Sequence, residues 1–283
     1  MRTGGQQKIP RPSQWEKGSV APWTGRDFAP LQSLEHVVAR IAAHTPQVAA
    51  TEFMPEARAS AVLVNLYQGE SGVEVVLTKR ASHLKNHKGE IAFPGGRVEP
   101  DEQVHAAALR EAVEEVALPA HDVTLVGELD HLLTIVSNSY IVPIVGMMPY
   151  KPTLIASADE VDRVLHVPLH ELVRSDTYAS EVWETPMGSR NIYMYHLDDE
   201  TIWGATARVL TQLLHTGVLA QQKAIIFGQF SNYKLVPAHD KGFKLATVVD
   251  WLRSQIKAPV LTGLPFGHVE TKVLLPVGAK VDL

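Results

Sequence analysis

The sequence predicts a mixed α+β fold in which a sheet lies between helices. Two runs rich in β-branched and aromatic residues, 59–67 and 73–78, flank a short polar turn that contains Gly69 and Gly72, as expected of a β-hairpin. The stretch after Pro100 is rich in Ala, Leu and Glu and contains no Gly or Pro, which predicts a helix that Asp101 can cap. Strands that precede and follow such a helix favour a mixed sheet covered by helices.

The remaining elements follow in order along the chain. Residues 1–28 are rich in Pro, Gly, Gln and Lys and predict a flexible N-terminal arm, whose Trp15 and Trp23 could dock on the body of the protein. The apolar spacing of residues 31–43 predicts a helix. We also expect strands at 123–129, 140–147, 190–197, 224–227 and 259–261, and a helix over 245–256.

Composition narrows the classes of function. The chain has 283 residues, of which 45% are hydrophobic, so it can bury a full core and has room for more than one unit. Its formal net charge of -5 argues against a general nucleic-acid binder, and the absence of Cys excludes thiol catalysis and disulfides. Residues 1–19 contain no apolar run and no stretch approaches the length of a membrane span, so we expect a cytoplasmic protein with no membrane contact.

Three carboxylates gather on one face of the helix after Pro100. On a 3.6-residue period Glu111, Glu114 and Glu115 share this face, and the sequence predicts that the opposite, buried face carries Ala106, Leu109, Val113 and Val116. Like charges this close repel one another and weaken a helix. An acidic solvated face explains Glu-x-x-Glu-Glu taken alone, whereas a hard divalent cation bound by the three carboxylates would remove the repulsion.

The full pattern from Gly95 to Leu118 favours the metal interpretation. Its spacing resembles the Nudix box, in which Gly, five residues, Glu and seven residues precede Arg-Glu-(apolar)-x-Glu-Glu. The matching positions are Gly96, Glu102, Arg110, Glu111, Ala112, Glu114, Glu115 and Leu118. Ala117 departs from the pattern, because the box has Gly there to end the helix.

The resemblance implies a Nudix fold and roles for the residues of the box. Glu111, Glu114 and Glu115 would be ligands of Mg²⁺ or Mn²⁺, and the Gly96 carbonyl would also face the metal. Arg110 would orient a Glu. A general base is needed as well, and we favour Glu114 over Glu102, which the resemblance treats as structural support.

The text before the box points to a substrate. Residues 76–96, VLTKRASHLKNHKGEIAFPGG, resemble the signature of the coenzyme A pyrophosphatase branch of Nudix hydrolases, and the following text resembles the same branch to about residue 210. Within that text, the stretch that contains Asp159-Glu160-Val161 resembles an element of the branch and implies a turn, strand and short helix over 157–169, and Ile202-Trp203-Gly204-Ala205-Thr206 resembles the start of its closing helix, which implies a helix over 201–215. Coenzyme A carries a pyrophosphate and a separate 3′-phosphate. The segment supplies cations for such groups, namely Arg80, Lys85, His87 and Lys88. A strand end followed by a basic solvated loop is the simpler interpretation of these residues.

The C-terminal text resembles another family, the LD-carboxypeptidases, which are serine peptidases that trim cell-wall peptides. The matching stretches are Leu210-Thr211-Gln212-Leu213, Gly228-Gln229-Phe230, Pro265-Phe266-Gly267-His268 and Leu275-Pro276. The resemblance implies that His268 matches the base of a Ser-His-carboxylate triad. The family's Ser would lie in a domain that precedes this text and has no counterpart here, so we expect His268 to have no catalytic role.

Taken together, the sequence predicts a fused chain. We expect a flexible arm at 1–28, a Nudix hydrolase domain at 29–215 and an incomplete LD-carboxypeptidase-like segment at 216–283. The predicted activity is metal-dependent hydrolysis of the pyrophosphate of coenzyme A or its thioesters, which gives 4′-phosphopantetheine and adenosine 3′,5′-bisphosphate. The alternatives are a Nudix hydrolase for ADP-ribose or NADH and, with less support, a serine peptidase. The expected partner is a small-molecule substrate, with a homodimer as a further expectation and no nucleic acid or membrane.

Overall fold

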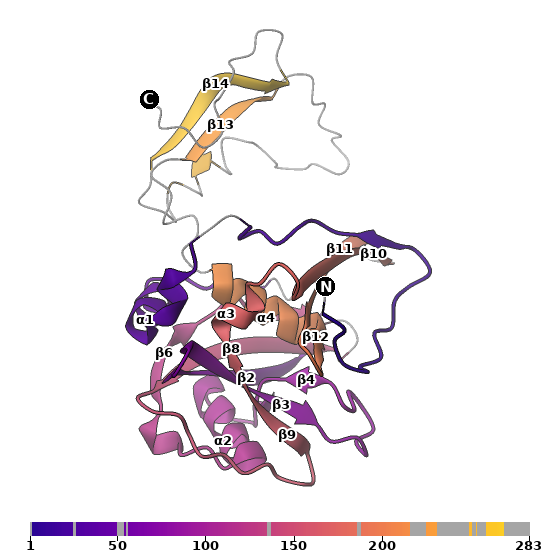
Figure 1. The fold of residues 1–283 in the computed structure, drawn as a ribbon, viewed down its shortest axis with the longest axis vertical. Helices are drawn as coiled ribbons and strands as arrows, with labels where there is room; N and C mark the ends of the chain where they lie inside the picture. The colour runs from indigo at the N-terminus through magenta and orange to yellow at the C-terminus, as the bar shows by residue number, and fades with distance from the viewer. Residues whose placement is uncertain are drawn as a thin grey trace. The chain divides into compact units, whose positions relative to one another are not determined.

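The computed structural model describes residues 2–24, 27–49, 54, 56–134, 137–185, 188–215, 225–230, 249–250, 253 and 259–268. The chain divides into two compact units, Met1–Thr216 and Gly217–Leu283, which are described separately below (Figure 1). The first unit contains two sheets and four helices within its described residues, so the prediction of a mixed α+β fold is confirmed.

An eight-stranded mixed sheet forms the centre of the first unit. The strands β2 (Arg58–Gly69) and β3 (Gly72–Arg80) form the predicted hairpin. Strand β2 also pairs in parallel with the whole length of β8 (Ser139–Met148). The strand order is β4-β3-β2-β8-β6, while β5 pairs with β2, β7 with β8 and β9 with β3. The bounds of the other strands are Ile91–Ala92 (β4), Gly95–Arg97 (β5), Thr124–Glu128 (β6), Leu132–Thr134 (β7) and Val161–Pro168 (β9).

A second, antiparallel sheet corrects the prediction for the N-terminus. Its order is β1-β10-β11-β12, with bounds Trp15–Lys17 (β1), Tyr178–Thr185 (β10), Gly188–His196 (β11) and Thr201–Trp203 (β12). The expected flexible arm therefore pairs with β10 through β1. Trp23 is only 4% exposed, its indole N–H donates to Val173 O at 3.1 Å, and its ring stacks on Tyr195. Burial of such a large aromatic side chain offsets the entropy lost when the segment is ordered.

Helices cover both faces of the large sheet. Figure 1 shows α1 (Leu34–Ala42), α3 (Leu169–Leu172) and α4 (Gly204–His215) on one side of it and α2 (Val104–Val116) on the other. Helix α4 begins at Gly204, not at residue 201 as the sequence predicted, because residues 201–203 pair with β11 as β12. Among the described residues, no helix is long and apolar enough to cross a membrane.

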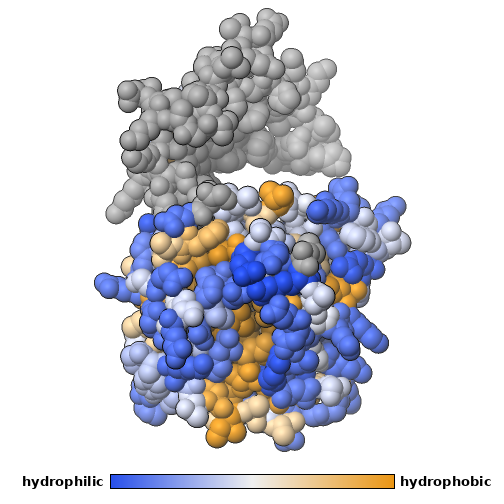
Figure 2. All heavy atoms as spheres, in the orientation of Figure 1, coloured by the Kyte–Doolittle hydropathy of each residue, from blue (hydrophilic) through white to orange (hydrophobic). Residues whose placement is uncertain are grey.

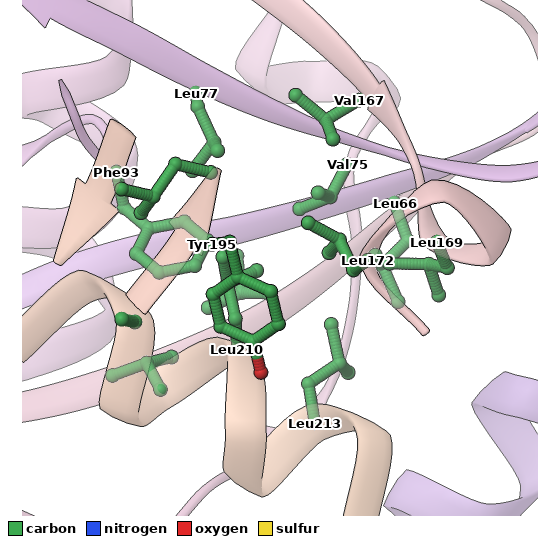
Figure 3. Close-up of a cluster of buried hydrophobic side chains, with 14 of the residues drawn as sticks. Leu66, Val75, Leu77, Phe93, Val167, Leu169, Leu172, Tyr195, Leu210 and Leu213 are labelled. Carbon is green, nitrogen blue, oxygen red and sulfur yellow. The ribbon is translucent and has the colours of Figure 1, made fainter. Parts of the chain in front are cut away.

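The larger hydrophobic cluster lies between the sheet and the group of α1, α3 and α4. Figure 3 shows Leu210 and Leu213 of α4 beside Tyr195 of β11, facing side chains of β2, β3 and α3. The Tyr195 hydroxyl is also within 2.8 Å of Thr211 Oγ1. Leu210, Thr211 and Leu213, which carry part of the LD-carboxypeptidase resemblance, are therefore buried in the core of the first unit. Outside, hydrophilic side chains cover most of the visible face, around a band of hydrophobic ones (Figure 2).

The second unit contains a two-stranded parallel sheet in its described part. It consists of β13 (Ile225–Phe230) and β14 (Val260–His268), which extend the predicted strands at 224–227 and 259–261. His268 pairs with Phe230 at the end of β14. The helix predicted over 245–256 lies largely outside the described residues.

Candidate active site

Helix α2 packs on the sheet through small side chains. Its buried residues are Ala107, Ala108, Ala112, Glu115 and Val116. The predicted apolar face is therefore wrong in part, since Val113 is 43% exposed and Glu115 takes a place on the buried side. Because alanine side chains are small, the helix can approach the sheet closely, and Glu115 is buried on the side of α2 that faces the sheet.

The start of α2 also differs from the prediction. Asp101 does not cap the helix: it has a positive φ of 63°, in the turn before the helix, and Gln103 occupies the N-cap position without a side-chain hydrogen bond. The Glu102 carboxylate accepts a hydrogen bond from the backbone N–H of Glu99 at 3.0 Å. Glu102 thus holds the turn that leads into the helix.

Ala117 ends α2 in the left-handed conformation, with φ 53° and ψ 38°. Its N–H donates to Val113 O at 2.9 Å, and the N–H of Leu118 donates to Ala112 O at 3.2 Å. The helix therefore stops as the Gly of the Nudix box would make it stop, although a residue with a Cβ adopts this conformation less readily than Gly does. The departure from the box leaves the course of the backbone intact.

Arg110 connects the carboxylates of the helix. Its Nε and Nη2 donate to the two oxygens of Glu102 at 2.9 and 3.1 Å, and its Nη1 donates to Glu111 Oε1 at 3.0 Å and to Glu114 Oε2 at 3.2 Å. The hydrogen bonds from Arg110 and Glu99 lower the pKa of Glu102 below its ordinary value. Glu102 is therefore held ionised and occupied on both oxygens, whereas Glu114 is 56% exposed and keeps most of its capacity to accept.

Glu115 is the buried carboxylate of the site. Its side chain is 3% exposed, and Oε2 has no hydrogen-bond partner among the described residues. Burial raises the pKa of Glu115 to about 8, and nearby Glu160 and Glu111 act in the same direction, while Arg80 and a backbone hydrogen bond from Gly95 oppose the shift. A buried acid with an orphaned oxygen is a group that a cation would stabilise in its charged form.

Arg80 brings the basic segment into contact with this acid. It lies at the end of β3, its Nη1 is 3.9 Å from Glu115 Oε1, and its Nε is buried without a partner among the described residues. Glu160 was not among the predicted site residues. Its place within the Asp159-Glu160-Val161 text that resembles the family was the available signal, and the structure places Glu160 close enough to raise the pKa of both Glu111 and Glu115.

Gly95 and Gly96 of β5 allow close approach of the backbone to its neighbours. A Cβ on Gly96 would collide with the carboxylate of Glu111, and a Cβ on Gly95 would lie 2.6 Å from Val62 Cα. Glu111 is thus pressed against the backbone of β5. Its pKa is raised mainly by burial, although Arg110 opposes the shift. Gly96, Glu111 and Glu115 therefore surround one small region between β5 and α2.

This region fits a divalent cation chemically, although its ligands are not gathered in a ready-made cluster. In the part of the chain that the structure describes, no three His, Asp or Glu side chains are close enough together to hold a metal ion. Arg110 pairs with Glu111 and Glu114 and supplies the positive charge locally. The orphaned oxygen of Glu115 and the raised pKa of Glu111 and Glu115 mark carboxylates that a bound cation would stabilise in the charged form.

The predicted substrate cations are divided between two settings. Lys85 and Lys88 are exposed on the loop after β3 and form no ion pair with the described residues. His87 has φ 55°, and its Nδ1 lies 3.0 Å from Glu90 Oε2, a contact that raises the pKa of His87. Arg80 points to the carboxylates instead. The structure thus separates one half-buried cation at the acids, Arg80, from a group of cations on the loop.

Comparison with known proteins identifies the class. The model of the NUDIX domain matches residues 57–185, and the model of the LD-carboxypeptidase C-terminal domain matches residues 194–283. The uncharacterized Nudix hydrolase NudL of Yersinia pestis (strain Pestoides F) is 37% identical over 140 residues, which cover 49% of this chain and 70% of NudL. The chain therefore belongs to the Nudix hydrolase family.

Solved Nudix structures resemble the chain more distantly. A MutT/nudix family protein from Enterococcus faecalis has 16% identity and a TM-score of 0.40, and covers 67% of this chain and 72% of its own. The Nudix hydrolase RenU from M. smegmatis has 20% identity and a TM-score of 0.36, and covers 41% and 73% respectively. Because both TM-scores are low, the family assignment rests on the sequence matches. Nudix hydrolases act on small-molecule nucleoside diphosphate derivatives and generally need divalent cations.

Proposed function

We propose that this Nudix hydrolase cleaves the pyrophosphate bond of coenzyme A or its thioesters, giving 4′-phosphopantetheine and adenosine 3′,5′-bisphosphate. The observation that supports this substrate is the position of Arg80, which joins the acidic helix to the loop bearing Lys85, His87 and Lys88. A pyrophosphate at the carboxylate site and a second phosphate at the loop would then both meet positive charge. We further propose 29–215 as the hydrolase domain and 216–283 as the incomplete LD-carboxypeptidase-like segment.

The proposed metal ligands are Glu111, Glu114 and Glu115, with the carbonyl of Gly96, and the proposed metal is Mg²⁺ or Mn²⁺. When bound, such an ion neutralises phosphate charge and lowers the pKa of water. Glu115 is held by the packing of α2, and its Oε2 has no competing hydrogen-bond partner among the described residues. Glu111 and Glu114 would exchange part of their contact with Arg110 for the ion, and Arg110 would remain anchored through Glu102.

Glu114 is the proposed general base. A base must be accessible to water and must not be fully occupied by donors. Glu102 fails this requirement, because Arg110 and the Glu99 backbone engage both of its oxygens, whereas Glu114 gives one oxygen to Arg110 and leaves the other free among the described residues. Arg110 would orient the carboxylates, and Arg80 would bind a phosphate oxygen beside Glu115.

Mass-spectrometric product analysis tests the proposed reaction. The purified full chain would be incubated with coenzyme A and Mg²⁺ in H₂¹⁸O. We expect 4′-phosphopantetheine and adenosine 3′,5′-bisphosphate, and the product that carries ¹⁸O reports which phosphorus is attacked. Parallel reactions with acetyl-coenzyme A, ADP-ribose and NADH measure preference, and a higher kcat/KM for either of the last two would replace the proposed substrate by the alternative Nudix substrate.

A peptidase is the second candidate, because the C-terminal match includes the position of His268. Such a peptidase needs a serine nucleophile and a carboxylate beside the imidazole. Hydrolysis of a murein tetrapeptide by the full chain would separate this candidate from the first.

A further inference from the structure

The first residues of the chain are held against the segment before β10 and against the turn between β11 and β12. The Arg2 N–H donates to Asp176 O at 2.9 Å, the Gly4 N–H to Leu197 O at 3.1 Å, and the Gly5 N–H to Thr201 Oγ1 at 3.0 Å. A Cβ on Gly5 would lie 2.6 Å from Glu200 Cα, so the segment approaches the turn as closely as glycine allows. These contacts fix the position of Gln7.

The side-chain carboxamide of Gln7 forms three hydrogen bonds at that place. Its Oε1 accepts from the Thr201 N–H at 2.8 Å, while its Nε2 donates to the carboxylate of Glu200 and to Gly89 O at 3.1 Å. Gly89 closes the loop that carries Lys85, His87 and Lys88. One side chain of the N-terminal segment therefore connects this loop to the base of β12.

Glu200 makes the connection rigid. Its side chain is 2% exposed and pairs with Lys79 Nζ at 2.8 Å and with Arg163 Nη2 at 2.7 Å. Lys79 immediately precedes Arg80 on β3. A buried carboxylate must be compensated by such partners, so the position of Glu200 is strongly determined. Through Gln7 and Lys79, the same carboxylate holds both ends of the loop.

The loop itself is closed by few backbone bonds. The Arg80 N–H donates to Glu90 O at 2.9 Å, the Gly89 N–H to Arg80 O at 3.0 Å, and the Glu90 N–H to His87 O at 3.2 Å. Gly89 has φ 69°, where glycine is favoured. The hydrogen bond from Gln7 therefore restrains the residue at which the loop turns back into the sheet.

We propose that Gln7, backed by Glu200, is a positioning residue that fixes the cationic loop for the second phosphate of the substrate. The inference rests on the proposed function, because it assumes that the loop binds substrate. A fixed loop places its cations without losing freedom at the moment of binding, so the restraint strengthens binding and leaves the chemical step at α2 unaffected.

The test compares two variants of Gln7 with a neighbouring control. Gln7→Ala removes all three bonds, and we expect it to raise KM for coenzyme A about tenfold with kcat within about twofold of wild type. KM for 3′-dephospho-coenzyme A should remain unchanged. Gln7→Glu keeps the size and the acceptor, loses both donors and puts a second carboxylate beside Glu200, so its KM for coenzyme A should rise further. Gln6→Ala, at an exposed neighbour, should match wild type.

Hydrogen exchange without substrate gives a second, independent result. In Gln7→Ala the amides of Gly89 and Glu90 should exchange faster, while those of β2 and β8 remain protected as in wild type. Equal KM values for Gln7→Ala and wild type would overturn the proposal, as would a parallel loss of activity on both substrates together with lower protection of β2. If wild type does not cleave coenzyme A, the proposed function fails, and exchange at Gly89 alone decides whether Gln7 holds the loop.

Discussion

At the scale of single residues, the site is a balance between buried acids and two arginines. Glu115 is the most deeply placed acid, and Arg80 is the nearest cation to it, 3.9 Å away. Glu115 Oε2 and Arg80 Nε also have no hydrogen-bond partner among the described residues. At this separation the ion pair therefore offsets only part of the free energy that burial of the Glu115 charge costs. Glu111 and Glu102, by contrast, each form a direct hydrogen bond with Arg110. Glu115 is therefore the acid with most to gain from a bound cation.

The first prediction concerns turnover. Glu115→Gln and Glu111→Gln each remove one charge with little change in shape, and we expect kcat to fall by at least about 10²-fold, with activity lost in EDTA and restored by Mg²⁺ or Mn²⁺. Steady-state kinetics with coenzyme A measures the effect. Glu99→Gln, outside the proposed ligand set, serves as the matched control. Turnover close to wild type in Glu115→Gln would contradict the metal-site assignment.

The second prediction concerns the stability of the metal-free protein. The pKa of Glu115 rises from the ordinary 4.5 to about 8 on folding, so between these values the folded state holds a proton that the unfolded chain has released. Stability from this group is complete below the lower value and is lost as pH rises through the higher one, by an amount on the order of 5 kcal/mol. Denaturant unfolding in EDTA at several pH values measures it.

A variant identifies the group responsible for this pH dependence. Gln in place of Glu115 resembles the protonated acid, so Glu115→Gln should unfold at a higher denaturant concentration than wild type at pH 8.5 in EDTA, and its stability should vary less with pH. Mg²⁺ should stabilise wild type at that pH more than the variant. A wild type whose stability does not change from pH 5 to 8.5 would show that Glu115 stays ionised in the fold.

At the scale of elements, the end of α2 shows how an alanine is tolerated where the Nudix box has Gly. Ala117 takes the left-handed conformation that the Nudix box reserves for Gly. Such a conformation costs an L-residue about 1–2 kcal/mol, which the packing of Leu118 and Val116 in the core offsets. The carboxylates lie upstream of this point and keep their register.

Ala117→Gly should therefore stabilise the protein. Relief of the left-handed strain exceeds the entropy that glycine adds to the unfolded chain, and we expect the free energy of unfolding to rise by about 0.5–1 kcal/mol. Ala106→Gly, inside the same helix, should lower it by about 1 kcal/mol. Urea titrations of the three proteins measure both changes. A destabilised Ala117→Gly would show that the αL geometry at this position is not strained.

The cationic loop carries the prediction on substrate choice. Lys79, although part of the basic segment, pairs with buried Glu200 and is withdrawn from the group that can meet substrate. Lys85, His87 and Lys88 remain on the loop. Loss of the 3′-phosphate should therefore lower kcat/KM by a factor that corresponds to about 1.5–3 kcal/mol of lost binding free energy. Comparing coenzyme A with 3′-dephospho-coenzyme A measures this loss, and Lys85→Ala or Lys88→Ala should reduce the difference. Equal specificity constants in wild type would show that the loop does not read this phosphate.

At the scale of the whole molecule, two families meet within one chain. The match to the LD-carboxypeptidase C-terminal domain begins at residue 194, while the first compact unit continues to Thr216. The residues between these points, including Leu210 and Leu213, pack into the core of the first unit. This packing uses the helical form of α4, whichever of the two families the sequence of this segment resembles.

His268 provides the prediction at this scale. It lies in β14, which belongs to the second unit, whereas α2 belongs to the first. We expect His268→Ala to leave coenzyme A hydrolysis unchanged and the full chain to release no amino acid from a murein tetrapeptide, because an imidazole without a nucleophile and an orienting carboxylate does not complete a triad. Peptide hydrolysis that is lost in His268→Ala would assign a catalytic role to this residue.

The sequence by itself determined the hairpin β2–β3, the helix α2 and the family. Alternation, helix propensity and the spacing of the box act over a few residues, so they can be read along the chain. The positions of Glu111, Glu114 and Glu115 on α2 follow from the same local rules. The turn, strand and short helix over 157–169 were predicted from the family resemblance, and the structure has them as a turn followed by β9 and α3.

The tertiary structure decided which of these acids is buried and what surrounds it. Helical periodicity places residues relative to one another but does not say how the helix is rotated against the sheet, so Glu115 moved to the buried side and Val113 to the surface. The ordered N-terminus has the same cause. Trp23 and Gln7 find their partners more than a hundred residues away, and contacts at that separation depend on how the sheets and helices pack together.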